Sequence, residues 1–123
     1  MKTFLTALGL ALVLQGIAVA EAPVMACNST PVSELQLLSA AELRKEYVDK
    51  VVRRGLLWAS YRQAKAAIAE VTTEDCRHCG DRFRVESQEI LVAIENCDAM
   101  VTRLERVMRA KHVKIPTDIP QVK

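Results

Sequence analysis

The four cysteines, Cys27, Cys76, Cys79 and Cys97, are the residues best suited to chemistry in this 123-residue chain. Two of them enclose Cys76-Arg77-His78-Cys79, which has the spacing of a thiol–disulfide oxidoreductase, and a histidine between two cysteines can stabilise a reactive thiolate. That chemistry is usually built beside β-strands, and no strand pattern occurs in the sequence. We therefore expect Cys76 and Cys79 to form a structural bridge, with a thiol-active redox protein as the alternative.

The same motif is incomplete as a metal or haem site. A closed zinc site needs four convergent ligands, and the other candidates, Cys97 and His112, lie far along the chain. Covalent haem attachment needs a histidine directly after the second cysteine, where Gly80 stands. The sequence also contains no evident Ser/His/Asp set and no glycine-rich phosphate loop. We expect no metal, no cofactor and no catalytic residue.

Two long helices are expected to position the cysteines. No proline occurs between Pro31 and Pro116, and the only glycines there are Gly55 and Gly80. Ser39 and Glu42 have the spacing of a capping box, so the first helix should begin there. Leu38 and Leu43 flank this box as a hydrophobic staple.

Apolar residues recur at helical spacing on both sides of the Cys76–Cys79 motif. The first stripe comprises Leu43, Tyr47, Val51, Leu57, Trp58, Tyr61, Ala64, Ile68 and Val71. The second alternates steps of four and three, as in a coiled-coil seam, through Phe83, Ser87, Ile90, Ile94, Cys97, Val101, Leu104 and Met108. We predict helices over 40–71 and 82–111, joined by a turn in which Gly80 takes a positive φ and Asp81 caps the second helix.

These elements predict an all-α fold, an antiparallel two-helix hairpin with an N-terminal arm tied on by a disulfide. Residues 21–38 form the arm, residues 39–115 the hairpin, and residues 116–123 an extended C-terminal tail. A two-helix hairpin has a thin core, so it should need support from disulfides or from a partner.

Hairpin geometry selects the disulfide pairing. With the turn near His78, Cys97 lies about 24 Å up the second helix, beyond the roughly 7 Å that a disulfide spans between Cα atoms. Neither Cys76 nor Cys79 reaches it, whereas an extended arm can carry Cys27 there. We predict Cys27–Cys97 and Cys76–Cys79. Two alternatives stay open, a buried free thiol at Cys97 and a helix break that brings Cys76 or Cys79 to it.

The N-terminus has the pattern of an export signal. A basic start at Lys2 precedes an apolar run, and Ala18-Val19-Ala20 supplies the small residues that a signal peptidase reads. We predict a signal peptide over residues 1–20 and a periplasmic or secreted protein. Val24-Met25-Ala26-Cys27 resembles a loose lipobox, so a lipoprotein with a lipidated Cys27 is an alternative.

Charge excludes one class of partner. The net charge of +2 falls to +1 once Lys2 is removed, a balance that argues against nucleic-acid binding. Basic side chains gather at the expected open end of the hairpin, where they could meet anionic lipid or an acidic protein surface. This group comprises Arg44, Lys45, Arg103, Arg106, Arg109, Lys111 and Lys114.

The aromatic residues of the first stripe, Tyr47, Trp58 and Tyr61, are expected to lie in the core. If the hairpin is too thin to cover them, they become a partner-binding surface, since such side chains dominate protein interfaces. The leading hypothesis is a non-enzymatic envelope protein that binds an envelope partner, or itself, through these aromatics together with Arg103, Arg106 and Arg109. Membrane contact is expected only through the basic end or a lipidated Cys27.

Overall fold

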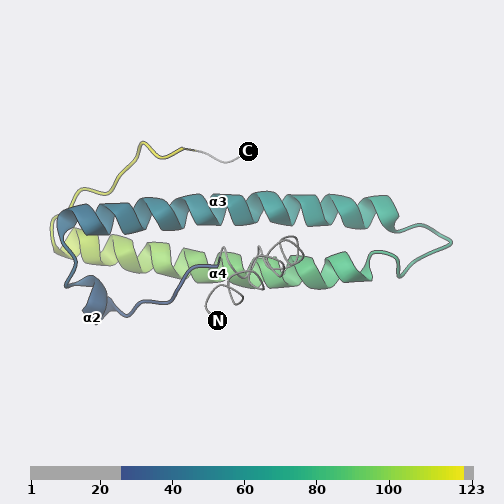
Figure 1. The fold of residues 1–123 in the computed structure, drawn as a ribbon, viewed down its shortest axis with the longest axis horizontal. Helices are drawn as coiled ribbons and strands as arrows, with labels where there is room; N and C mark the ends of the chain where they lie inside the picture. The colour runs from purple at the N-terminus through teal and green to yellow at the C-terminus, as the bar shows by residue number, and fades with distance from the viewer. Residues whose placement is uncertain (1–25, 121–123) are drawn as a thin grey trace, which may run out of the picture.

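The computed structural model describes residues 26–120 and folds them into an antiparallel hairpin of two long helices (Figure 1). Helix α3 spans Ala40–Val71 and helix α4 spans Asp81–Ala110. A short helix, α2, spans Val32–Leu35 and lies at the open end, opposite the connecting loop. The all-α hairpin is the predicted fold, and the predicted helix bounds are met to within one residue. The predicted signal peptide, residues 1–20, lies outside the described residues.

A capping box begins α3 at the predicted position. The Ser39 Oγ accepts from the backbone N–H of Glu42 at 3.1 Å, and the Glu42 carboxylate accepts from the N–H of Ser39 at 2.8 Å. These two hydrogen bonds, the one from the backbone of Ser39 foremost, lower the pKa of the Glu42 carboxyl. Leu38 and Leu43, the predicted staple, both belong to the apolar cluster at this end.

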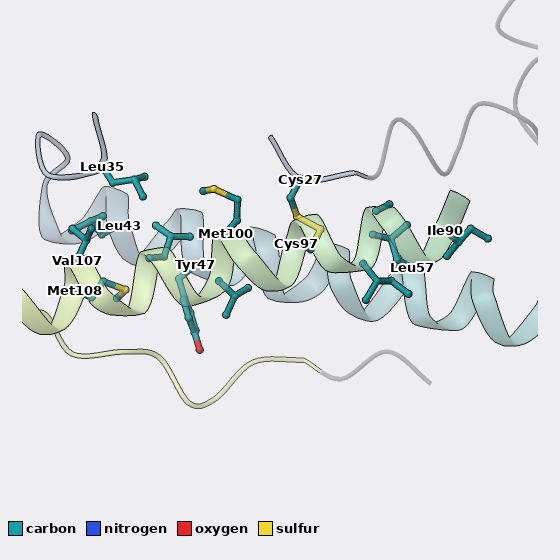
Figure 2. Packing of buried hydrophobic residues seen from close by; sticks show 14 of the residues in the cluster. Cys27, Leu35, Leu43, Tyr47, Leu57, Ile90, Cys97, Met100, Val107 and Met108 are labelled. Carbon is teal, nitrogen blue, oxygen red and sulfur yellow. A yellow bond between two sulfur atoms is a disulfide. The ribbon is translucent and has the colours of Figure 1, made fainter. Parts of the chain in front are cut away.

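Helix α4 supplies most of the core between the helices (Figure 2). Every residue of its predicted seam is buried except Phe83, which is partly exposed. The stripe on α3 is less regular, since Leu43, Tyr47, Leu57 and Ala64 are buried while Trp58 and Val71 are exposed. The expectation that Trp58 lies in the core is therefore wrong, because two helices alone do not enclose a side chain on the flank of their interface.

The N-terminal arm lies along α4 and is attached at several points. Arg103 Nη1 donates to the Thr30 carbonyl at 2.6 Å, and Lys111 Nζ donates to the Leu38 carbonyl at 2.6 Å. Leu35, on α2, is 1 % exposed and packs into the core cluster. No periodicity in the sequence indicates α2, because one turn of helix is too short to show a period.

The C-terminal tail turns back and runs along the hairpin on the side away from the arm (Figures 1 and 2). Val113, Ile115 and Ile119 pack against the core cluster. The turn uses a Schellman motif, in which the N–H of Val113 donates to the Met108 carbonyl at 2.8 Å and the N–H of His112 to the Arg109 carbonyl at 3.1 Å. Residues 113–120 therefore contain no helix and are packed against the hairpin.

The end of the loop between the long helices differs from the prediction at Gly80 and at Asp81. Gly80 has a φ of −93°, so no positive φ is used, and Asp81 is the first residue of α4 instead of its cap. A Cβ built at Gly80 would lie 2.5 Å from Thr72 Oγ1 and 3.3 Å from Ile68 Cγ2. Glycine is required here because the end of α3 closes directly over the start of α4.

Candidate functional site

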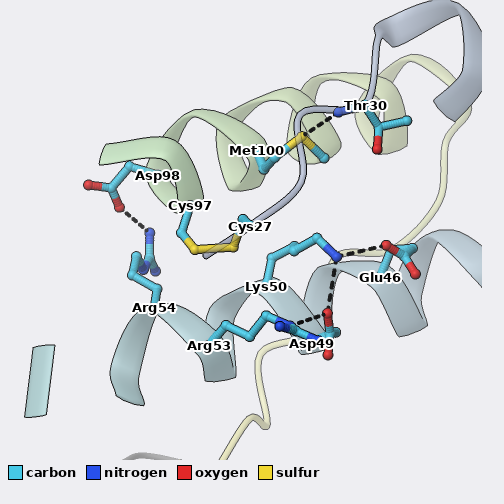
Figure 3. Close-up of a disulfide and its surroundings, with 10 residues drawn as sticks. All are labelled: Cys27, Thr30, Glu46, Asp49, Lys50, Arg53, Arg54, Cys97, Asp98 and Met100. Carbon is cyan, nitrogen blue, oxygen red and sulfur yellow. Dashed lines mark hydrogen bonds and ion pairs between the residues drawn. A yellow bond between two sulfur atoms is a disulfide. The ribbon is translucent and has the colours of Figure 1, made fainter. Parts of the chain in front are cut away.

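The Cys27–Cys97 disulfide joins the arm to the middle of α4 (Figure 3). The Cα atoms are 4.9 Å apart, and Cys27 and Cys97 are 7 % and 0 % exposed. This is the pairing that the straight-helix geometry predicts, and no free cysteine is present among the described residues. A buried disulfide is protected from attack by outside thiolates, which is consistent with a structural bond.

Beside this disulfide, charged groups occupy part of the α3 seam (Figure 3). Lys50 is 7 % exposed, and its Nζ lies 3.0 Å from carboxylate oxygens of both Glu46 and Asp49. Burial alone would lower the pKa of Lys50, but the hydrogen bonds and charges of these two carboxylates outweigh it and raise the pKa. Arg54 Nη1 lies 2.9 Å from Asp98 Oδ1 and so links α3 to α4.

Lys50 and Arg54 were not among the predicted site residues, although their spacing indicates a seam position. Steps of four and three from Leu43 lead through Tyr47 to position 50, and then to positions 54 and 57. The seam of α3 therefore includes two basic residues between Tyr47 and Leu57. The predicted stripe contained apolar residues only, so it passed through Val51 and Trp58, which lie beside the interface between the helices.

The Cys76–Cys79 disulfide lies in the loop at the tip of the hairpin, with its Cα atoms 5.4 Å apart. Cys79 is exposed and Cys76 is partly exposed. His78 Nδ1 lies 3.0 Å from the Asp81 carboxylate, which also pairs with Arg84. Of the two bonds, only this one is open to solvent.

The three predicted aromatics lie on one side of α3 but differ in burial. Tyr47 is buried and its hydroxyl donates to Glu105 at 2.8 Å, and burial together with this carboxylate raises the pKa of Tyr47. Trp58 is 40 % exposed and Tyr61 is partly buried. Their rings meet edge to face, with centroids 5.7 Å apart. Tyr47 is thus a core residue, whereas Trp58 and Tyr61 reach the surface.

The predicted basic residues of α4 serve different purposes. Arg103 binds the arm, because its Nη1 donates to the Thr30 carbonyl and also to Ser29 Oγ at 3.3 Å. Arg109 lies 3.8 Å from Glu105, one turn away on the same helix. Arg106 is exposed. Arg103 therefore attaches the arm to α4, whereas Arg106 and Arg109 lie on the helix surface.

Exposed apolar side chains gather in one half of the hairpin, here called the tip half: residues 56–71 of α3 and 81–96 of α4. Five of the six large apolar side chains exposed among the described residues lie in it: Leu56, Trp58, Val71, Val85 and Val92. The sixth, Leu37, follows α2. The tip half is the candidate binding surface.

These side chains continue faces that the chain covers with its own segments. Val92 and Val85 precede Arg103 by eleven and eighteen residues, close to whole numbers of turns, so they extend the α4 face on which the arm lies. Trp58 follows Tyr47 by eleven residues, and Tyr47 points toward the side of the returning tail (Figure 2). In the described part of the chain, arm and tail both lie beside the other half (Figure 1).

Among residues 26–120, no three His, Cys, Asp or Glu side chains are grouped so that they could hold a metal ion. In the same residues, no helix is long and apolar enough to cross a membrane. The chain matches no protein-family model, no curated protein and no solved structure.

Proposed function

We propose that this protein is a non-enzymatic binding component of the cell envelope, which binds another protein through the tip half of its hairpin. The observation that carries the proposal is the location of the exposed apolar side chains, five of six of which lie there. Val85 and Val92 lie on the arm side of the hairpin and Trp58 on the side of the tail, so the proposed partner contacts the tip half on both sides. Exposed apolar side chains concentrated in one region favour a contact with another protein. Trp58 and Tyr61 supply the aromatic anchors that such contacts favour.

The molecule's own segments indicate what the partner offers. In the other half, the arm fills one face with Leu35 and the tail packs Ile115 and Ile119 against the core. Both are short segments that place isolated apolar side chains against the hairpin, and in the arm Arg103 and Lys111 also bind backbone carbonyls. The expected ligand is therefore a helical or extended segment of a partner protein, with apolar side chains at regular spacing.

The compartment is part of the proposal. Two disulfides are characteristic of an oxidising environment, and the N-terminal pattern of residues 1–20 favours export into the periplasm or out of the cell. Because Sγ of Cys27 is bonded to Cys97, the same sulfur cannot carry a lipid. The disulfide therefore favours a protein that is not anchored through Cys27.

Site-specific photo-crosslinking tests the surface in the native envelope. A photoreactive side chain placed at Val92 or Trp58 is expected to give a discrete adduct with one partner, whereas the same group at Leu37 gives none. Leu37 is the matched control because it is apolar and 84 % exposed but lies outside the tip half. Adducts from Leu37 alone, or from no position, would contradict the proposal.

Affinity for the crosslinked partner then measures the contribution of the anchor. Trp58→Ala is expected to weaken binding by about tenfold or more, as loss of a partly buried interface tryptophan typically does. Leu37→Ala should leave the affinity unchanged. Melting temperatures of both variants separate a lost contact from a lost fold, since an interface residue leaves the melting temperature nearly unaltered.

A further inference from the structure

The two disulfides of this protein differ in their access to solvent. Cys27 and Cys97 are buried between the arm and the helices, whereas Cys79 is exposed and Cys76 partly so. Disulfide exchange requires a thiolate to approach one sulfur along the line of the bond. In the folded state only the bond at the tip offers such an approach.

The tip is closed by contacts that do not depend on its disulfide. Gly80 is buried against Thr72 and Ile68, and Arg84 Nη2 donates to Thr72 Oγ1 at 3.2 Å. The backbones of Thr73 and Cys76 exchange two hydrogen bonds, of 3.2 and 3.1 Å. These contacts remain when the bridge opens, and a bridge across three residues constrains the chain less than one that closes a long loop, so the bond can open while the hairpin stays folded.

The surroundings of Cys79 favour the thiolate. Cys79 directly precedes Gly80, the N-cap of the 30-residue helix α4, which has no side-chain cap hydrogen bond. The partial positive charge of a helix N-terminus stabilises a thiolate close to it, and Arg77 and His78 stand between the cysteines. Of the acidic groups in the loop, Asp81 is paired with Arg84 and lies within 3.0 Å of His78, while Glu74 and Asp75 are exposed.

We propose that Cys76–Cys79 is a thiol–disulfide exchange site that accepts electrons from a protein dithiol. A thiolate of the dithiol attacks the exposed Sγ of Cys79, forms a mixed disulfide and releases Cys76 as a thiolate, which takes up a proton. The second thiol of the donor, as its thiolate, then attacks the donor sulfur of the mixed disulfide and releases Cys79. The donor is oxidised to a disulfide, and the tip gains two electrons and two protons. This site is separate from the tip-half surface and does not depend on it.

Graded reduction of the oxidised full-length protein tests the proposal. Dithiothreitol at near-neutral pH serves as the probe, and alkylation followed by peptide mapping identifies the opened cysteines. We expect Cys76 and Cys79 to be alkylated at least about 100-fold faster than Cys27 and Cys97, with unaltered helical circular dichroism, since only the tip is accessible. Opening of both bonds together, or only with loss of helix, would overturn the proposal.

A peptide control separates a tuned site from mere exposure. A synthetic peptide of residues 72–82, closed by the same disulfide, has the same sequence but lacks α3 and α4. The equilibrium constant for reduction of the bond is expected to be at least about fivefold larger in the protein than in the peptide, because the α4 N-terminus stabilises the Cys79 thiolate of the reduced form. An equal or smaller constant in the protein would show that the fold adds nothing to the loop and would sink the proposal.

The attacked sulfur has its own pair of variants. Cys76→Ser leaves Cys79 as the sole tip thiol, and Cys79→Ser leaves Cys76. With an aromatic disulfide reagent, the Cys79 thiol should form the mixed disulfide about tenfold faster, since it is the more exposed and the nearer to the helix. A faster Cys76 would reverse the assigned roles and contradict the mechanism proposed here.

Discussion

His112 adopts a conformation that most side chains avoid. Its φ is 58°, in the left-handed region, and it occupies the position after the C-cap Lys111 where a Schellman motif normally places glycine. The backbone hydrogen bonds from His112 and Val113 hold it there. A Cβ in this region costs about 1 kcal/mol, so the turn that sends the tail back along the hairpin is maintained against local strain.

Replacing this residue with glycine should relieve the strain. His112→Gly is expected to raise the free energy of unfolding by about 0.5–1 kcal/mol, because glycine adopts positive φ without steric cost. Urea denaturation followed by circular dichroism measures the difference. His112→Ala keeps the Cβ and should bring no gain. A gain from alanine as large as that from glycine would show that the imidazole, and not the backbone, is unfavourable at this position.

At the scale of elements, the contact between the end of α3 and the start of α4 depends on Gly80. Gly80→Ala is expected to lower the free energy of unfolding by about 1–3 kcal/mol, since the new Cβ would overlap Thr72 Oγ1. Gly55→Ala is the control, because position 55 lies within α3, where alanine is favoured by up to about 1 kcal/mol. Thermal unfolding of both variants checks the prediction. Equal gains would mean that the tip is loosely packed.

The long helices were predictable because their signals are local. The Ser39–Glu42 capping box and the seam of α4 each depend on residues three or four positions apart, so each can be identified from the sequence without knowing the fold. The packing of the arm and of the tail has no such local signal. Leu35 and Ile119 are single apolar residues in short or extended segments, and their burial depends on a surface formed elsewhere in the chain.

The candidate surface was predictable only in part, for a related reason. The aromatic residues were predicted to be core or interface, but which of them is exposed depends on which half of the hairpin the described parts of the arm and tail lie beside. Val85 and Val92 had no distinguishing pattern, since an apolar residue on a helix flank is common in soluble proteins. Lys50 and Arg54 were missed because charged residues at seam positions are read as surface unless the heptad is followed strictly.

For the whole molecule, the disulfide at Cys97 joins the arm to α4 at the core that α4 shares with α3. Without it, the arm would keep the hydrogen bonds of Arg103 and Lys111 and the packing of Leu35, but its first residues would be released. The bond closes a loop with a sequence separation of 70, whereas the tip bond has a separation of 3. Loop-closure entropy therefore makes the two bonds unequal in their contribution to stability.

The last prediction follows from that inequality. Cys27→Ala with Cys97→Ala is expected to lower the free energy of unfolding by about 4 kcal/mol, against about 2 kcal/mol for Cys76→Ala with Cys79→Ala. Hydrogen exchange should locate the losses, with the first pair exposing amides of the arm and of α4 beyond position 97, and the second only those near the tip. Equal losses from the two pairs would contradict this division. The arm would then be held by its hydrogen bonds and by Leu35, and the buried disulfide would be dispensable for the fold.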